Sequence, residues 1–188
     1  VARALEYYRQ GTAAGERTLG ARFFAENAGH FWGLLETRPY MRARKGLADT
    51  LWRLGKKEEA RDHYRELLRL NPGDNQGNRY LLVDLLLQMG PDDAVWQLLD
   101  EYKDEWSAEW LYTHALLEFR KGGASNEANQ ALRAALGQNP HVPDYLAERK
   151  RIPVKLPDYI GIGDENEAVS YAADHLNHWR RTPGAVAW

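Results

Sequence analysis

The chain has 188 residues, of which 44% are hydrophobic and 28% are charged, a balance typical of a folded globular protein and not of a disordered one. The formal net charge of −2 provides no overall positive field, which argues against general nucleic-acid binding. The lack of cysteine excludes disulfides, thiolate zinc ligands and a cysteine nucleophile. No apolar run approaches the roughly 20 residues that span a bilayer, so we expect a soluble, cytoplasmic protein.

Residues 1–40 precede the regular part of the chain. Ala4 and Tyr8 have helical spacing, and we assign them to the second helix of a preceding hairpin. Residues 15–40 are rich in aromatic side chains and predict one irregular packed helix followed by a turn at Pro39. Because helical patterning is under way at the first residues and a new helix is predicted to begin near the last, we expect a piece of a longer protein.

Residues 41–140 repeat with a constant period. Ala60 and Ala128 each follow a glycine by five residues and precede a large side chain by four, and they lie 68 residues apart, which is twice 34. Ala94 lies midway between them, and Pro72 and Pro140 close the outer copies. A period of 34 residues is that of a two-helix repeat, in which a small residue lets the two helix backbones approach.

This pattern resembles the tetratricopeptide repeat (TPR) family. The resemblance implies an all-α fold, a right-handed superhelix of three regular repeats flanked by irregular hairpins. The expected repeats cover residues 41–74, 75–108 and 109–142.

The last part of the chain differs in composition from the repeats. Residues 141–163 contain several prolines and glycines and predict a connector. Asp164 and Glu167 then form a capping-box pattern at the start of a helix. Thr182 and the proline after it predict the start of another helix, so residues 164–188 are expected to form a degenerate, truncated fourth hairpin. The stripe expected to be buried on its first helix consists of Ala168, Tyr171, Ala172, His175, Leu176 and Trp179.

A second resemblance lies in the same region. The stretch "NPHVPDYL" at residues 139–146, the Gly163-Asp164 pair and the helix "YAADHLNHW" at residues 171–179 resemble the suppressor-of-tumorigenicity-7 family. The resemblance implies a repeat scaffold with no assigned reaction, from a family whose animal members are regarded as membrane-associated.

The candidate binding site is the concave groove that TPR proteins line with fixed positions of the first helix of each repeat. Basic and apolar side chains predominate there, which favours a protein partner with carboxylates and an aliphatic or aromatic anchor. The alternative is a solvated face that binds nothing. The predicted groove residues are Arg42, Lys45, Asp49, Trp52, Arg53, Gln76, Arg79, Val83, Trp110, Thr113 and Arg120. Recognition of chaperone tails is rejected, because Lys45 fits the required pattern but Asp49, Tyr80, Trp110 and His114 do not.

Two other functional classes stay open. Arg38, Arg42, Arg44 and Lys45, together with Arg149, Lys150 and Arg151, could bind nucleic acid or another anion. His175 and His178, spaced i, i+3, could hold a metal in an enzyme, but structural histidines are the preferred interpretation because no metalloprotease motif is present. No catalytic constellation or phosphate-binding loop is found, so we expect no enzymatic activity and no cofactor. The sequence does not indicate an oligomeric state.

Overall fold

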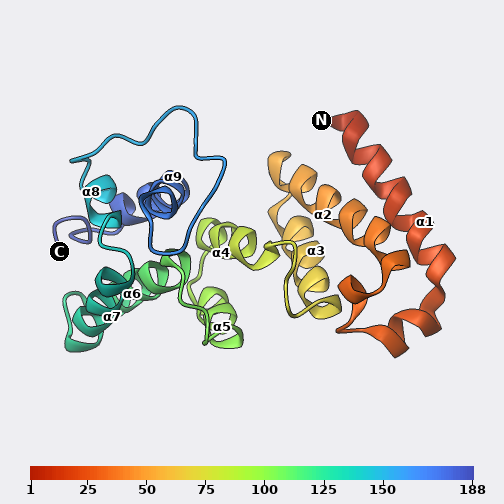
Figure 1. Ribbon diagram of the computed structural model, residues 1–188, viewed down its shortest axis with the longest axis horizontal. Coiled ribbons are helices and arrows are strands. Elements are labelled where there is room, and N and C mark those ends of the chain that lie inside the picture. The colour runs from red at the N-terminus through yellow and green to blue at the C-terminus, as the bar shows by residue number, and fades with distance from the viewer. The chain divides into compact units, whose positions relative to one another are not determined.

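The computed structural model describes residues 1–188 and contains helices but no strands, which confirms the predicted all-α class. Two compact units, Val1–Met89 and Gly90–Trp188, make up the chain, and the boundary falls between α4 and α5 (Figure 1). Among the helices, none combines the length and apolar character that crossing a bilayer requires.

Unit 1 consists of α1 (Ala2–Asn27), two short 3-10 turns (Phe31–Gly33 and Leu35–Thr37), α2 (Arg38–Arg53), α3 (Lys57–Leu70) and α4 (Asn78–Met89). A hairpin of α2 and α3 lies at its centre, and Gly55 takes a positive φ of 75° in the turn between them. Ala60 and Tyr64 of α3 are fully buried, as the repeat pattern predicts. The neighbouring helix α4 packs on α3.

The first forty residues differ from the expectation. α1 is one long helix that kinks at Gly20, where φ is 77°, and it packs along α2. Pro39 does not end a helix but lies in the first turn of α2, where a proline costs no hydrogen bond. The aromatic residues instead gather where the chain turns back, since the Phe31 ring lies 4.9 Å from that of Phe24 and 6.1 Å from that of Tyr40.

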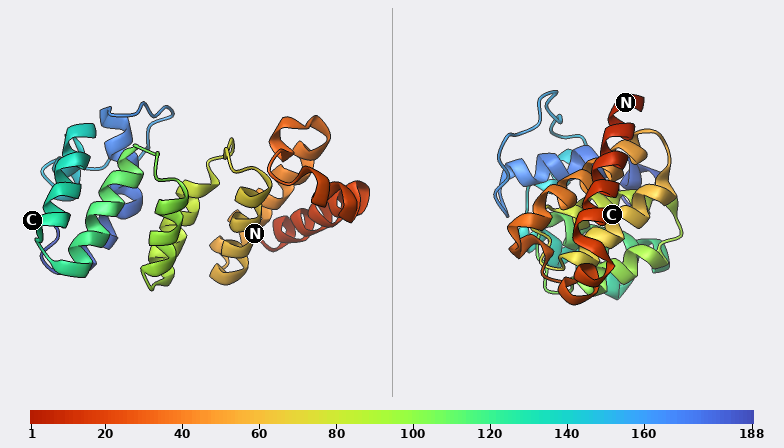
Figure 2. Two further views of the ribbon diagram at one scale, coloured as in Figure 1. Left: turned by 90° about the horizontal axis from the view of Figure 1, so that it is seen from below. Right: turned by 90° about the vertical axis from the view of Figure 1, so that its right-hand side faces the viewer.

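Unit 2 consists of α5 (Asp93–Glu101), α6 (Ala108–Gly122), α7 (Asn126–Gln138), α8 (Val142–Leu146) and α9 (Glu165–Arg181). The hairpin of α6 and α7, whose helices lie side by side in Figure 2, turns at Gly123 with a φ of 62°. Ser125 caps α7 by accepting a 3.1 Å hydrogen bond from the amide of Ala128. Helix α9 packs on α8 and α6.

The predicted apolar stripe of α9 faces the core of unit 2, where Ala168, Tyr171, Ala172, His175 and Trp179 are buried. Asp164 caps the helix, as predicted, by accepting a 2.8 Å hydrogen bond from the amide of Glu167. The reciprocal half of the capping box is absent, because the Glu167 carboxylate bonds to other parts of unit 2.

The helix predicted to start at Thr182 is not formed. Residues 182–187 form turns, in which the amide of Ala185 donates to the carbonyl of Thr182 and the amide of Trp188 donates to that of Gly184. Gly184 has a φ of 86°, which is incompatible with a right-handed helix. The segment therefore folds back on unit 2, where the Trp188 ring packs at a tilt against the Phe119 ring with 4.6 Å between their centres.

Candidate partner-binding surface and apolar pocket

The predicted groove residues of α2 share one face of that helix. They follow each other at the spacing of a single helical stripe, and Arg42 and Arg53 are separated by about three turns, or about 16 Å along the axis. The Trp52 indole donates a 3.4 Å hydrogen bond from Nε1 to Oε1 of Gln88, so this face of α2 lies beside α4. The surface formed by α2 and α4 is called the α2–α4 face below.

Unpaired charge on the α2–α4 face is positive. Arg42 and Arg53 are exposed and make no hydrogen bond or ion pair. Asp49, by contrast, accepts a 2.6 Å hydrogen bond from the Tyr64 hydroxyl and pairs with Nζ of Lys45 at 3.0 Å. Burial and the hydrogen bond to Asp49 both raise the pKa of Tyr64, so its hydroxyl remains a donor. The carboxylate of Asp49 is thus occupied within unit 1.

The remaining predicted residues of unit 1 lie before and within α4. Nη2 of Arg79 donates to the Tyr80 hydroxyl at 2.9 Å, and its guanidinium lies 4.7 Å from the centre of that ring. A second guanidinium nitrogen of Arg79 lies 3.8 Å from the buried carboxylate of Asp74. Gln76 is half-buried and Val83 is fully buried. Arg79 is therefore held in place, and Val83 has no exposed surface to offer a partner.

Unit 2 contains the other three predicted residues, and each is engaged inside the unit. The buried Trp110 indole donates to the carbonyl of Leu99 at 3.4 Å. Thr113 is fully buried. Arg120 donates to Thr182 at 3.0 Å and pairs with Asp92 at 2.7 Å. Whether these residues continue a groove from the α2–α4 face stays a prediction.

A buried polar network joins the family-like segments of unit 2. The carboxylate of Glu167 accepts hydrogen bonds from the amide of Ala108 at 2.9 Å, the amide of Gly163 at 2.7 Å and the side chain of Asn139 at 2.8 Å. The Asn139 side chain also donates to the carbonyl of Asp164 and accepts from the amide of His141. Asn139 and Glu167 thereby connect the start of α6, the end of α7 and the start of α9.

His175 and His178 are both buried on α9. Nε2 of His175 lies 2.6 Å from Oε1 of Glu109, and the imidazole stacks on the Tyr171 ring at 4.6 Å. The two imidazole centres are 5.7 Å apart. Burial raises the pKa of Tyr171, so this phenol stays neutral. The carboxylate partner and the stacked ring fit the role of a structural histidine for His175.

The predicted basic patches are largely paired. Arg44 bonds to the Tyr40 hydroxyl and pairs with Glu16, and Arg38 donates to the carbonyl of Trp32. In the connector, Arg149 pairs with Asp144 at 3.0 Å and Lys150 with Glu165 at 2.7 Å. These pairs lower the net positive charge available to a nucleic-acid backbone.

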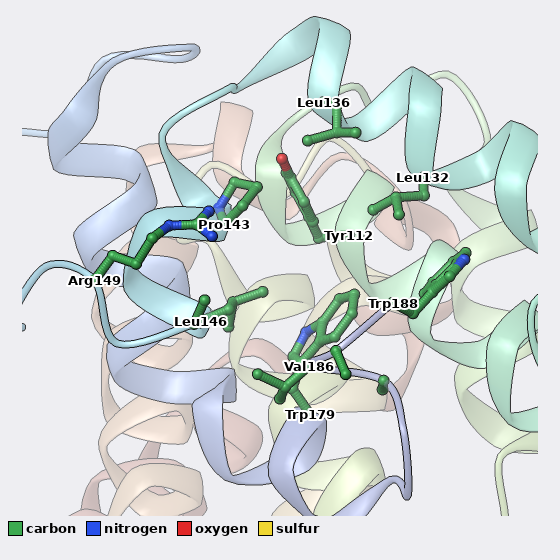
Figure 3. A pocket seen from close by; sticks show the side chains of 12 residues that line it. Tyr112, Leu132, Leu136, Pro143, Leu146, Arg149, Trp179, Val186 and Trp188 are labelled. Atoms are coloured by element: carbon green, nitrogen blue, oxygen red, sulfur yellow. The ribbon is translucent and has the colours of Figure 1, made fainter.

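An apolar pocket of about 210 Å³ opens in unit 2 (Figure 3). Figure 3 shows that its walls come from α6, α7, α8, α9 and the last turn of the chain. Its larger lining side chains are Tyr112, Leu132, Leu136, Pro143, Leu146, Arg149, Trp179, Val186 and Trp188.

Sequence reasoning missed this pocket. Leu132 and Leu136 are one turn apart on α7, and Leu136 is partly exposed. The apolar stripe of α7 therefore extends beyond the residues that are buried against α6. That stripe is the one local signal of a further surface. The last turn, which closes another side of the pocket, was expected to be a helix.

Comparison with known proteins finds relatives of similar sequence. The chain is 32% identical over 170 residues to "Suppressor of tumorigenicity 7 protein-like" of Rattus norvegicus and to "Suppressor of tumorigenicity 7 protein" of Macaca fascicularis. It is 32% identical over 177 residues to "Protein ST7 homolog" of Drosophila melanogaster. Each match covers 80% of this chain, which spans about 30% of the length of these relatives. No solved structure matches the chain significantly.

The match to a family model agrees with the resemblance of "NPHVPDYL" and the α9 segment. The model described as "ST7 protein" matches residues 36–188, which include every helix from α2 to α9. The chain therefore belongs to the ST7 protein family.

Proposed function

We propose that this chain is a non-enzymatic protein-interaction module, built as a TPR-like right-handed solenoid of helical hairpins, that binds a partner segment on its α2–α4 face. The observation that carries the proposal is the pair of exposed, unpaired guanidinium groups of Arg42 and Arg53 on either side of the half-buried Trp52. Arginine and tryptophan are enriched where protein interfaces concentrate their binding energy.

The partner chemistry follows from the same face. A segment with carboxylates would be attracted to both arginines, and an aliphatic or aromatic side chain could pack on the Trp52 ring. The packing of α4 on α3, together with the Trp52–Gln88 hydrogen bond, supports a repeat arrangement in which each hairpin stacks on the one before it. Nucleic-acid binding has no comparable observation in its favour, because the basic side chains of the predicted patches are largely paired.

The test uses fluorescent peptides whose acidic residues and apolar anchor are varied independently, with binding followed by anisotropy. The double variant Arg42→Glu with Arg53→Glu should lower the affinity for acidic peptides about tenfold or more. Arg17→Glu with Arg133→Glu makes the same change in net charge at exposed arginines elsewhere, and should alter binding less than about twofold. Equal losses in both variants, or no binding by any peptide to the native chain, would refute the proposal.

A further inference from the structure

The apolar pocket of unit 2 is a second potential binding site and is independent of the α2–α4 face. Its volume is about 210 Å³. A cavity of about 150 Å³ suffices to bind benzene, so the pocket has room for a six-membered ring or a short alkyl chain.

The aromatic walls of the pocket are held in place by hydrogen bonds to residues that do not line it. The Tyr112 hydroxyl donates to the carbonyl of Asn139 at 2.6 Å, and the Trp179 indole donates to the Tyr171 hydroxyl at 2.9 Å. The Trp188 indole donates to Oδ1 of Asn129 at 2.8 Å. Since their polar atoms are already bonded, these rings present apolar surface to a ligand, and little side-chain freedom is left to lose on binding.

Arg149 is the only residue with a charged side chain that lines the pocket, and Figure 3 shows it at the edge of the cavity. Its Nε donates to Asp144 at 3.0 Å, while its two terminal nitrogens donate to no group of the protein. The side chain is 63% exposed, so the cation keeps its hydration without a ligand. A guanidinium with two free terminal nitrogens can bind a carboxylate through paired hydrogen bonds.

We propose that this pocket binds a small amphipathic monocarboxylate, such as an arylalkanoate or a short fatty acid. The apolar part lies between Leu132, Leu146 and the Trp179 ring, and the carboxylate meets Arg149 at the mouth. The charge complementarity selects an acid over a neutral or cationic ligand of the same shape. Because the Asp144 carboxylate already pairs with Arg149 and offsets part of its positive charge, the preference for acids is modest.

The experiment compares matched acids and alcohols. Phenylpropionate and hexanoate, with phenylpropanol and hexanol as uncharged counterparts, are titrated into the protein while the indole N–H signals of Trp179 and Trp188 are followed by NMR. The acids should shift both signals and bind about fivefold more tightly than the alcohols, a factor expected for a charge-assisted contact at an exposed arginine.

Three variants make the outcome decisive. Arg149→Gln should remove the preference for acids and leave alcohol binding unchanged, whereas Arg151→Gln, at an exposed neighbour that does not line the pocket, should change neither. Leu136→Trp, which fills the pocket from a partly exposed position, should abolish the binding of both ligand classes. Equal affinity for acids and alcohols in the native protein, or acid binding that survives Leu136→Trp in the folded variant, would overturn the proposal.

Discussion

Asn139 is a residue at which several separate segments of unit 2 meet. Its side-chain amide donates to the carbonyl of Asp164 and to the carboxylate of Glu167, its side-chain oxygen accepts from the amide of His141, and its own carbonyl accepts from Tyr112. Both Asn139 and Glu167 are buried. A buried polar group that loses its partner costs about 1–3 kcal/mol, so each member of this network depends on the others.

The first prediction concerns Asn139→Asp. The substitution removes the amide donor and places a second carboxylate beside that of Glu167, so the free energy of unfolding at neutral pH should fall by about 3 kcal/mol. Burial and the neighbouring charge raise the pKa of the new carboxyl in the folded state, so the loss should be largest above that pKa and should shrink as the pH falls through it. Urea unfolding at several pH values measures this.

Asn126→Asp is the matched control, because Asn126 is exposed in the first turn of α7, where a carboxylate is favourable. It should leave the stability of the protein unchanged or raise it slightly. Equal stability of Asn139→Asp and the native protein at neutral pH would show that the network does not stabilise unit 2.

At the scale of helices, the crossing of α1 and α2 depends on two glycines of α1. A Cβ atom built on Gly15 would lie 2.9 Å from the Cβ of Tyr40, and one built on Gly11 would lie 3.3 Å from the Cβ of Ala43. Tyr40 is buried and its Cβ is fixed to the backbone, so it cannot move aside as an exposed side-chain tip could. The two backbones therefore approach closely because a side chain is missing, as at the alanine crossings of the repeats.

The second prediction is that Gly15→Ala lowers the stability of the protein by about 1–3 kcal/mol, because overpacking at Tyr40 outweighs the higher helix propensity of alanine. Thermal unfolding followed by circular dichroism measures this. Gly137→Ala in α7, where nothing lies within 4 Å of the added atom, isolates the propensity effect and should stabilise by up to about 1 kcal/mol. A similar stabilisation in both variants would contradict the close crossing.

At the scale of the whole molecule, the chain forms two compact units, each with its own buried core. The Asn139–Glu167 network lies entirely within unit 2, and the glycine crossing lies entirely within unit 1. Regions of a protein with separate internal contacts open separately, with free energies that depend on their own interactions.

The third prediction tests this separation with Glu167→Gln, which leaves one of the donors around the carboxylate without a partner. Amide hydrogen exchange should become faster for the backbone of α6, α7 and α9, and should stay within about twofold of the native rate for α1, α2 and α3. Hydrogen exchange followed by mass spectrometry resolves these segments. A uniform increase over the chain would show that the two units open together.

Much of the local structure could be predicted because it depends on neighbours in the sequence. The spacing of alanines and large side chains located α2, α3, α6 and α7, and Asp164 marked the start of α9. The helix expected after Thr182 does not form, because Gly184 adopts a positive φ of 86°. The proline after Thr182 is in a favourable position for a helix start, but that position alone does not make the helix continue. The bonds of Glu167 were unpredictable for another reason, since its partner Ala108 lies 59 residues away.

The sequence by itself determined the helical class, most helix positions and the family, because hydrophobic periodicity and short motifs are local properties. Only the tertiary structure decided which of the predicted groove residues are exposed: Arg42 and Arg53 are free, whereas Trp110 and Thr113 are buried. It also decided that side chains from four helices and the last turn enclose a pocket with Arg149 at its mouth. Burial and enclosure depend on which distant segments pack together, and no periodicity of a single helix carries that information.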